Sequence, residues 1–102
     1  MSVNQEQLQK LIDKLVNVVK PKGVEHIDCE LEPLNIRDNE YYLFITYIFP
    51  DNSPYLTKHL TGPQIKAEWN EQIKKTIKTY FGIDVIINSS SFTSKSFYNR
   101  KK

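Results

Sequence analysis

The chain has 102 residues, the size of one compact domain, and its 39% of hydrophobic and 25% of charged residues are typical of a folded globular protein. No run approaches the roughly 20 apolar residues of a membrane span, and the N-terminus lacks a signal-peptide pattern, so we expect no membrane contact. A single cysteine, Cys29, excludes an internal disulfide and a cysteine-rich zinc site. We therefore expect a protein of a reducing compartment, without a cofactor.

Two features of the composition are more specific. Ile, Lys and Asn make up 31 of the 102 residues, a bias typical of AT-rich genomes such as those of low-GC bacteria and phages. Residues 1–51 carry 5 basic and 9 acidic side chains, a net charge of −4, whereas residues 52–102 carry 9 basic and 3 acidic ones, a net charge of +6. This division predicts a surface with an acidic and a basic side, which suits self-association or an acidic partner.

The first expected element is a helix, because its apolar residues recur at spacings of three and four. Pro21 disfavours a helical conformation of the residue before it, and Gly23 permits a tight reversal, so the helix should end there. Its apolar stripe consists of Leu8, Leu11, Ile12, Leu15 and Val19.

Two strands should follow this helix. Ile27, Cys29 and Leu31 alternate with polar residues, which is the pattern of a strand with one buried face. After a polar connection, residues 41–49 are aromatic or β-branched on both faces. Such a run predicts a central strand, or a strand whose second face is covered by a partner.

The second half begins with a long connection, residues 50–62, in which residues 55–60 are expected to form a short edge strand. A helix should come next, with Pro63 in its first turn and Gly82 as its C-terminal cap. The expected apolar face of this helix consists of Ile65, Trp69, Ile73, Ile77 and Tyr80. A third strand then has on one side Ile83, Val85 and Ile87.

The expected fold class is α+β, a two-layer module of order helix, strand, strand, helix, strand, with a small sheet and both helices on one face. Residues 1–88 form this domain, and residues 89–102 form an extended polar, aromatic and basic C-terminal arm. The last strand follows its helix, so it can pair parallel to the first strand through a right-handed crossover. The same order occurs in nucleic-acid modules of the K-homology type, but the isolated glycines provide no Gly-x-x-Gly loop.

One acidic strand face invites a metal interpretation. His26, Asp28, Glu30 and Glu32 project from the same side of the first strand, and carboxylate oxygens suit a hard cation. Alternate side chains on one strand stand about 7 Å apart in a line, which is poor geometry for closing a coordination shell. A solvated or lysine-paired acidic face is therefore favoured, and we predict no metal site.

No catalytic constellation is visible. Cys29 falls on the apolar side of its strand, opposite His26, so the two cannot form a nucleophile–base pair there. A nuclease of the restriction-enzyme type is excluded because no lysine occurs between residues 37 and 53, where its catalytic pair would lie. We therefore predict that the protein is not an enzyme and has no catalytic residues.

The leading hypothesis is a non-enzymatic structural or assembly protein that acts through protein–protein contacts, as one copy in an oligomeric assembly. A phage virion component is its most specific form, so we expect the protein to be cytoplasmic or part of a virion. The chain has more aromatic surface than two helices can shelter, and its polar arm keeps three rings, which suits strand addition to a neighbour. The residues expected to contact other protein subunits are Tyr41, Tyr47, Phe49, Tyr55, Phe92, Phe97 and Tyr98.

A small nucleic-acid-binding protein is the alternative. From residue 74 onward, seven basic residues accompany a single acid, Asp84, and aromatic residues are interleaved with the last four. Nucleic-acid bases stack on aromatic side chains beside such charges. Only two arginines occur and the sequence pI is about 8.6, which is a weak basic footprint. The candidate residues are Lys74, Lys75, Lys78, Lys95, Arg100, Lys101 and Lys102.

Overall fold

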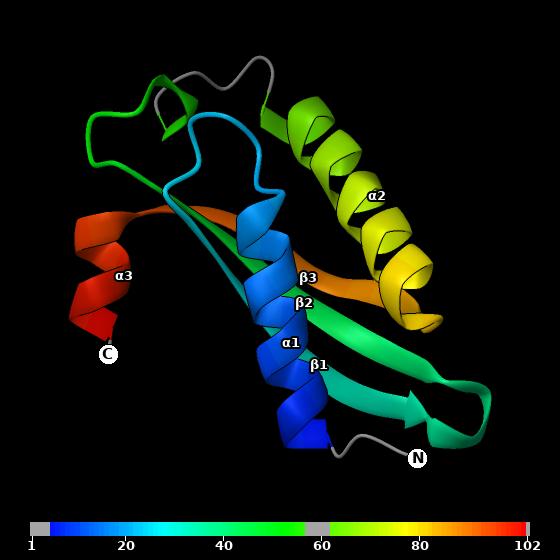
Figure 1. Ribbon diagram of the computed structural model, residues 1–102. Helices are drawn as coiled ribbons and strands as arrows, with labels where there is room; N and C mark the ends of the chain where they lie inside the picture. Colours follow the sequence, from blue (N-terminus) through cyan, green and yellow to red (C-terminus); the bar gives the residue numbers. More distant parts are fainter. Residues whose placement is uncertain (1–4, 57–61, 102) are drawn as a thin grey trace.

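The computed structural model describes residues 5–56 and 62–101, and Figure 1 shows their arrangement. None of the helices within these ranges is long and apolar enough to cross a membrane. The elements follow in the order α1 (Gln5–Val18), β1 (His26–Asn35), η1 (Ile36–Asp38), β2 (Glu40–Phe49), η2 (Pro54–Leu56), α2 (Gly62–Phe81), β3 (Asp84–Ser94) and α3 (Lys95–Lys101), where η marks a 3-10 turn.

The sheet is mixed, with β2 as its central strand. β1 pairs antiparallel with β2, and β3 pairs parallel with β2 on its other side. The predicted α+β fold and its helix–strand order are confirmed. The predicted parallel pairing of the last strand with the first is wrong. Side chains of α1 occupy the outer edge of β1, so β3 joins the free side of β2.

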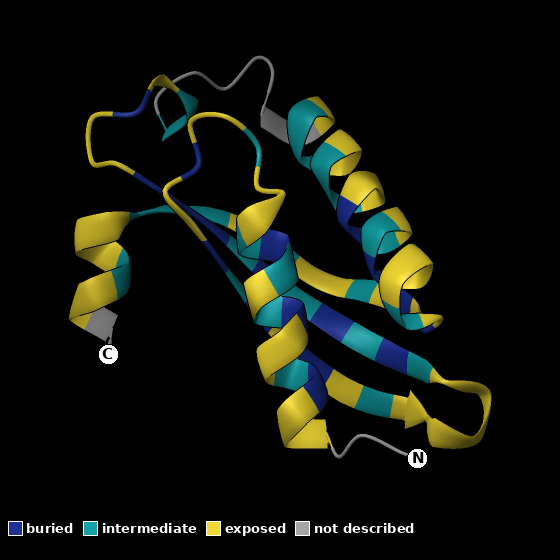
Figure 2. Cartoon of the chain, viewed as in Figure 1, coloured by how far each residue is buried: buried dark blue, intermediate teal, exposed yellow. Residues whose placement is uncertain are grey.

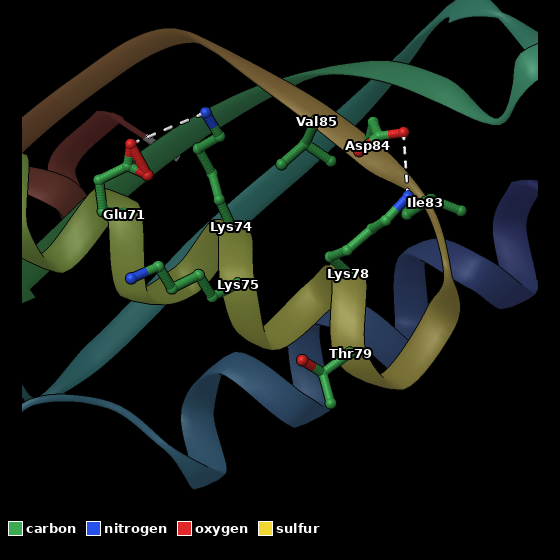
Figure 3. Close-up of a pocket in the computed structure, with 8 residues that line it drawn as sticks. All are labelled: Glu71, Lys74, Lys75, Lys78, Thr79, Ile83, Asp84 and Val85. Atoms are coloured by element: carbon green, nitrogen blue, oxygen red, sulfur yellow. Dashed lines mark hydrogen bonds and ion pairs between the residues drawn. The ribbon is translucent and has the colours of Figure 1, made fainter.

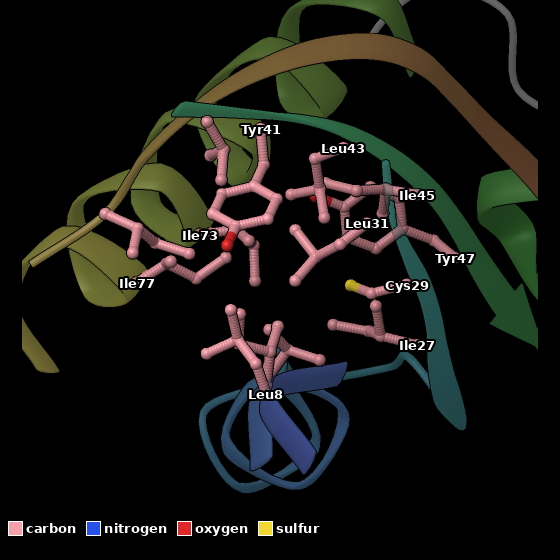
Figure 4. Packing of buried hydrophobic residues seen from close by; sticks show 14 of the residues in the cluster. Leu8, Ile27, Cys29, Leu31, Tyr41, Leu43, Ile45, Tyr47, Ile73 and Ile77 are labelled. Atoms are coloured by element: carbon pink, nitrogen blue, oxygen red, sulfur yellow. The ribbon is translucent and has the colours of Figure 1, made fainter. Parts of the chain in front are cut away.

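Both long helices cover one face of the sheet, where the core lies. Figure 2 shows this as dark blue bands on the facing sides of the helices and strands, and Figure 4 shows their side chains converging. The odd-numbered residues of β2 all point into this layer. Other buried members are Leu8, Ile12 and Val16 of α1, Ile27, Cys29 and Leu31 of β1, Ile73 and Ile77 of α2, and Val85 of β3.

The buried stripes of the helices differ in detail from the predicted ones. In α1, Val16 joins the core and Leu11 is 46% exposed, whereas Val19, which follows the last residue of α1, is 42% exposed. The buried residues of α1 thus recur every four positions, because the polar side of this helix turns toward β1. In α2, Tyr80 is 69% exposed, and Ile83 after the helix takes the buried position instead.

Two glycines with positive φ lie in connections: Gly82 follows α2, and Gly23 lies between α1 and β1, beside the η2 turn. Gly82 has a φ of +69° and its N–H donates to the carbonyl oxygen of Lys78 at 2.9 Å, which ends α2 as predicted. Gly23 has a φ of +97°, and a Cβ there would lie 3.2 Å from the ring of Tyr55. Tyr55 belongs to η2, so the strand predicted from residue 55 does not begin there. The rest of that predicted strand, residues 57–60, lies outside the described residues.

Residues 89–94 do not leave the domain as an arm. They continue β3 and pair with the second half of β2, from Ser89 opposite Phe44 to Ser94 opposite Phe49. A register shift near Leu43 changes which residues of β3 face the helices, so that Phe92 lies on the core face. The ring of Phe92 therefore finds its apolar surroundings inside this chain, and the residues after it form α3.

Candidate functional site

The second face of the sheet is not covered by α1 or α2. As predicted, the polar residues of β1 share this face, and they stand opposite the even-numbered residues of β2. Tyr42 and Phe44 lie half-buried at its centre, and Ile86 of β3, opposite Tyr42, is 48% exposed. We call this surface the open face; its residues are Glu30, Glu32, Tyr42, Phe44, Ile86 and Ser89.

The short helix α3 covers the other end of the same face. The Tyr98 hydroxyl donates to Asp28 Oδ2 at 2.6 Å, and this bond to a carboxylate raises the pKa of Tyr98 to about 12. At the start of α3, the backbone N–H and the hydroxyl of Ser96 both donate to the Asp51 carboxylate, which lowers the pKa of Asp51. Ile48, at this end of β2, is only 3% exposed. The face is therefore closed near Ile48 and accessible near Tyr42.

Three of the predicted partner-binding residues lie in the core of their own chain. Tyr41, Tyr47 and Phe49 are 8%, 0% and 0% exposed, because they sit on the face of β2 that the long helices cover. The interpretation of these rings as contacts to another subunit is therefore corrected. Of the others, Phe97 is 49% exposed on α3, and Tyr98 is the residue that holds α3 to β1.

The remaining two, Tyr55 and Phe92, belong to a cluster of aromatic rings. Its five members are Tyr47, Phe49, Tyr55, Trp69 and Phe92. The centroid of Phe92 lies 4.8 Å from that of Phe49, in an edge-to-face arrangement, and 5.6 Å from that of Trp69. Tyr55 stacks on Phe49 at 5.4 Å. Ring pairs of this kind contribute about 0.5–1.5 kcal/mol beyond their burial. The aromatic surplus of the sequence thus goes largely into internal packing.

The outer edge of β1 is closed by side chains of α1. The Asn17 carboxamide binds both backbone groups of Ile27: its Nδ2 donates to the Ile27 carbonyl oxygen at 2.9 Å, and its Oδ1 accepts from the Ile27 N–H at 2.8 Å. Gln9 also uses both ends of its carboxamide but binds two residues: it donates to the Cys29 carbonyl oxygen at 2.6 Å and accepts from the Leu31 N–H at 2.7 Å. These carboxamides occupy the positions that a further strand would take.

Two more residues of α1 complete this edge. Gln5 donates to the carbonyl oxygen of Leu31 at 3.3 Å, and the Asp13 carboxylate accepts a hydrogen bond from the Cys29 backbone. Four helical residues advance about 6 Å and two strand residues about 6.6 Å, so a four-residue spacing on α1 follows alternate residues of β1. We call Gln5, Gln9, Asp13 and Asn17 the polar ladder. Their spacing of four residues is visible in the sequence, but a polar ladder was not among the predicted features.

Asp13 is the imperfect position of the ladder. Its Oδ1 is buried and has no hydrogen-bond partner within the described part of the chain. Burial raises the pKa of the Asp13 carboxyl, although its bond to Gln9 and the Cys29 backbone act in the opposite direction.

The β3 edge of the sheet is treated differently. Along the described chain one side chain reaches its outer backbone: Lys66 Nζ donates to the carbonyl oxygen of Ser90 at 3.2 Å. A groove of about 440 Å³ lies between α2 and the start of β3 (Figure 3). We call it the lysine groove; it is lined by Glu71, Lys74, Lys75, Lys78, Thr79, Ile83, Asp84 and Val85.

The candidate nucleic-acid residues do not form one surface. The lysines of α2 lie near Asp84, at the start of β3, whereas Lys95 and Arg100 follow its end, about 30 Å away along an 11-residue strand. Lys95 also lies 3.5 Å from the Glu25 carboxylate. Lys101 ends α3, and Lys102 lies outside the described residues.

A metal site and a cysteine nucleophile find no support in the described ranges. No group of three or more His, Cys, Asp or Glu residues among them is placed to hold a metal ion. Cys29 is buried as predicted, 3% exposed, and burial raises the pKa of its thiol, which disfavours the reactive thiolate.

Comparison with protein family models, with curated proteins and with solved structures gives no match to this chain.

Proposed function

We propose that the chain is a non-enzymatic protein–protein contact module, one copy among several in an assembly, with the open face as its contact surface. The supporting observation is the position of Tyr42 and Phe44, two half-buried rings at the centre of a sheet face that neither α1 nor α2 covers. Ile86 extends this apolar centre toward β3. Aromatic side chains at the centre of a surface with polar flanks are typical of protein contacts.

The partner that we propose is a second copy of the chain. Glu30 flanks Phe44 on the β1 side, and Ser89 flanks it on the β3 side. When two copies meet face to face about a two-fold axis parallel to the strands, β2 lies over β2, and β1 of each copy lies over β3 of the other. The glutamates then face hydroxyl donors instead of each other, and the rings of the two copies pack together.

The size of the open face predicts a weak contact. Three strands about 4.8 Å apart and about five residues long cover on the order of 250 Å² in projection, less than the roughly 800 Å² per partner of a stable complex. Such contacts become effective when many copies are held together. A phage virion is one such assembly, and the composition of the chain is the support for that specific form of the proposal.

Sedimentation equilibrium over a wide range of concentrations, up to millimolar, tests this proposal. We expect the average mass of the wild type to rise with concentration, and Phe44→Ser to abolish the rise. Ile36→Ser is the matched control, because Ile36 is 67% exposed but lies in η1, outside the open face. A single-chain mass at every concentration, or equal effects of the two variants, would contradict the proposal.

Nucleic-acid binding has less support, because its candidate residues are divided between the two ends of β3. Retention on immobilised single-stranded DNA tests it. Retention that falls with rising salt, and that Lys74→Glu and Lys75→Glu abolish, would favour this alternative over the assembly proposal.

A further inference from the structure

We propose that the outer edge of β3, with the lysine groove beside it, binds an extended acidic segment of another protein as an added strand. This inference does not rest on the open face, since it uses the outer edge of β3 and the side chains of the lysine groove.

The first argument is the state of the strand edge. β3 pairs with β2 on one side and, among residues 5–56 and 62–101, with no strand on the other, so alternate N–H and C=O groups along its 11 residues point away from the sheet. Within the described chain, Lys66 binds one of these groups, the Ser90 carbonyl. The other sheet edge has a dedicated ladder of side chains on three consecutive outward-facing residues of β1. The β3 edge is therefore the one that can accept a strand.

The second argument is the charge beside that edge. Three lysines of α2 line the groove, together with two acidic residues, and Lys66 adds another positive charge along the strand. Lys74 lies 4.0 Å from Glu71 and Lys78 lies 3.1 Å from Asp84. All four of these side chains are at least 40% exposed, so both ion pairs are weak and can exchange for the carboxylates of a ligand.

The same lysines decide between two occupants. Pairing of two β3 strands from two copies would bring the lysine rows of both copies toward the shared edge, and lysines beside an edge strand oppose such self-pairing. The carboxylates of an acidic strand would instead be attracted by these lysines. Because strand side chains alternate, every second residue of the added strand would face the α2 lysines, and the others would extend the face that carries Ile86. The partner segment should therefore carry carboxylates at every second position.

The probe is a short fluorescent peptide in which glutamate alternates with valine, blocked at both ends, and the readout is fluorescence anisotropy with the full chain at low salt. We expect it to bind. A peptide with the same side chains but with alternate backbone nitrogens methylated cannot add to a strand edge, and it should bind at least about tenfold more weakly. A lysine–valine peptide should not bind. Equal binding of the methylated peptide would overturn strand addition.

Charge reversal in the groove supplies the matched pair of variants. The double variant Lys74→Glu with Lys78→Glu should bind the acidic peptide about tenfold more weakly than the wild type, or weaker still. Lys10→Glu with Lys14→Glu makes the same change in net charge on exposed positions of α1 and should leave binding within about twofold. Equal losses in the two double variants would overturn a local site, as would a failure of the wild type to bind. Thermal melting confirms that each variant is folded.

Failure of this inference is distinguishable from failure of the assembly proposal. Phe44→Ser should lose the concentration-dependent rise in mass but bind the acidic peptide like the wild type. Lys74→Glu with Lys78→Glu should keep the rise in mass but bind the acidic peptide more weakly.

Discussion

Each edge strand of the sheet has outward-facing backbone N–H and C=O groups, and the two edges differ in whether these groups are bound. At β1, the polar ladder of α1 binds the outward backbone groups, so that edge is closed by its own chain. At β3, lysines line the edge but leave most of its backbone accessible within the described residues. One helix is therefore enough to close a sheet edge in this fold. The edge without such a ladder is therefore the natural place for a partner strand.

The largest effect should come from breaking the closed edge. Asn17→Ala removes the donor and the acceptor that bind Ile27, leaving two backbone groups without partners. We expect a loss of about 2–3 kcal/mol in the free energy of unfolding, measured by urea denaturation. Lys14→Ala on the exposed side of the same helix is the control. A loss below about 0.5 kcal/mol for Asn17→Ala would show that the ladder does not hold the edge.

A smaller loss of stability should follow from a substitution at the outer edge of β3. Lys66→Met removes the bond to the Ser90 carbonyl and the ammonium that lies 5.8 Å from the Phe92 ring centroid. We expect a loss of about 1 kcal/mol, since both contacts are partly exposed. Lys75→Met, on the same helix, should change the free energy of unfolding by less than about 0.5 kcal/mol. If the two variants behave alike, Lys66 makes no specific contact with β3.

The polar ladder can also be improved. Asp13→Asn replaces a buried carboxylate oxygen without a partner by an amide that matches Gln9 and Asn17. Because the folded pKa of Asp13 is raised, its ionised form disfavours folding at neutral pH and its protonated form does not. The variant should therefore be more stable at neutral pH, by up to about 1 kcal/mol. This advantage should disappear as the pH falls through the raised pKa. Thermal melts at several pH values measure it, and destabilisation at neutral pH would contradict the prediction.

The smallest effect concerns α3, which covers the end of the sheet face that lies beyond the open face. The pKa of Asp51 is lowered by its bonds to Ser96, so their contribution is present above the ordinary value of 3.8 and is lost as the pH falls below it. The protection factors of the α3 amides, which correct for the slower intrinsic exchange in acid, should fall at a higher pH than those of the sheet amides. Asp51→Asn should show the faster exchange already at neutral pH, and unchanged exchange would contradict this role.

The α+β order of elements was predictable because it depends on local periodicity. Alternation in β1 and the β-branched residues of β2 are read directly, and Gly82 ends α2 where its permissive backbone is needed. The C-terminal segment was misinterpreted for a physical reason. A serine-rich strand carries little apolar pattern, and only its pairing with β2 shows that residues 89–94 belong to the sheet.

The candidate site was less predictable than the fold. The alternation placed Glu30 and Glu32 on one face, as the structure confirms. It could not tell which rings of the two-faced strand β2 would be covered, so Tyr47 was assigned to a partner and Phe44 was not. Which face a helix covers depends on contacts between distant segments, and these leave no signature in a short window of sequence.

The order helix, strand, strand, helix, strand, the acidic and basic halves of the chain and the burial of Cys29 could be predicted from the sequence, because these properties follow from neighbouring residues. The pairing of β3 with β2 and the closure of the β1 edge by α1 could be recognised only in the folded chain. The same holds for the position of the α2 lysines beside the outer edge of β3. The reason is that strand order and edge closure are decided between segments far apart in the chain, by which backbone groups find partners once the core has formed.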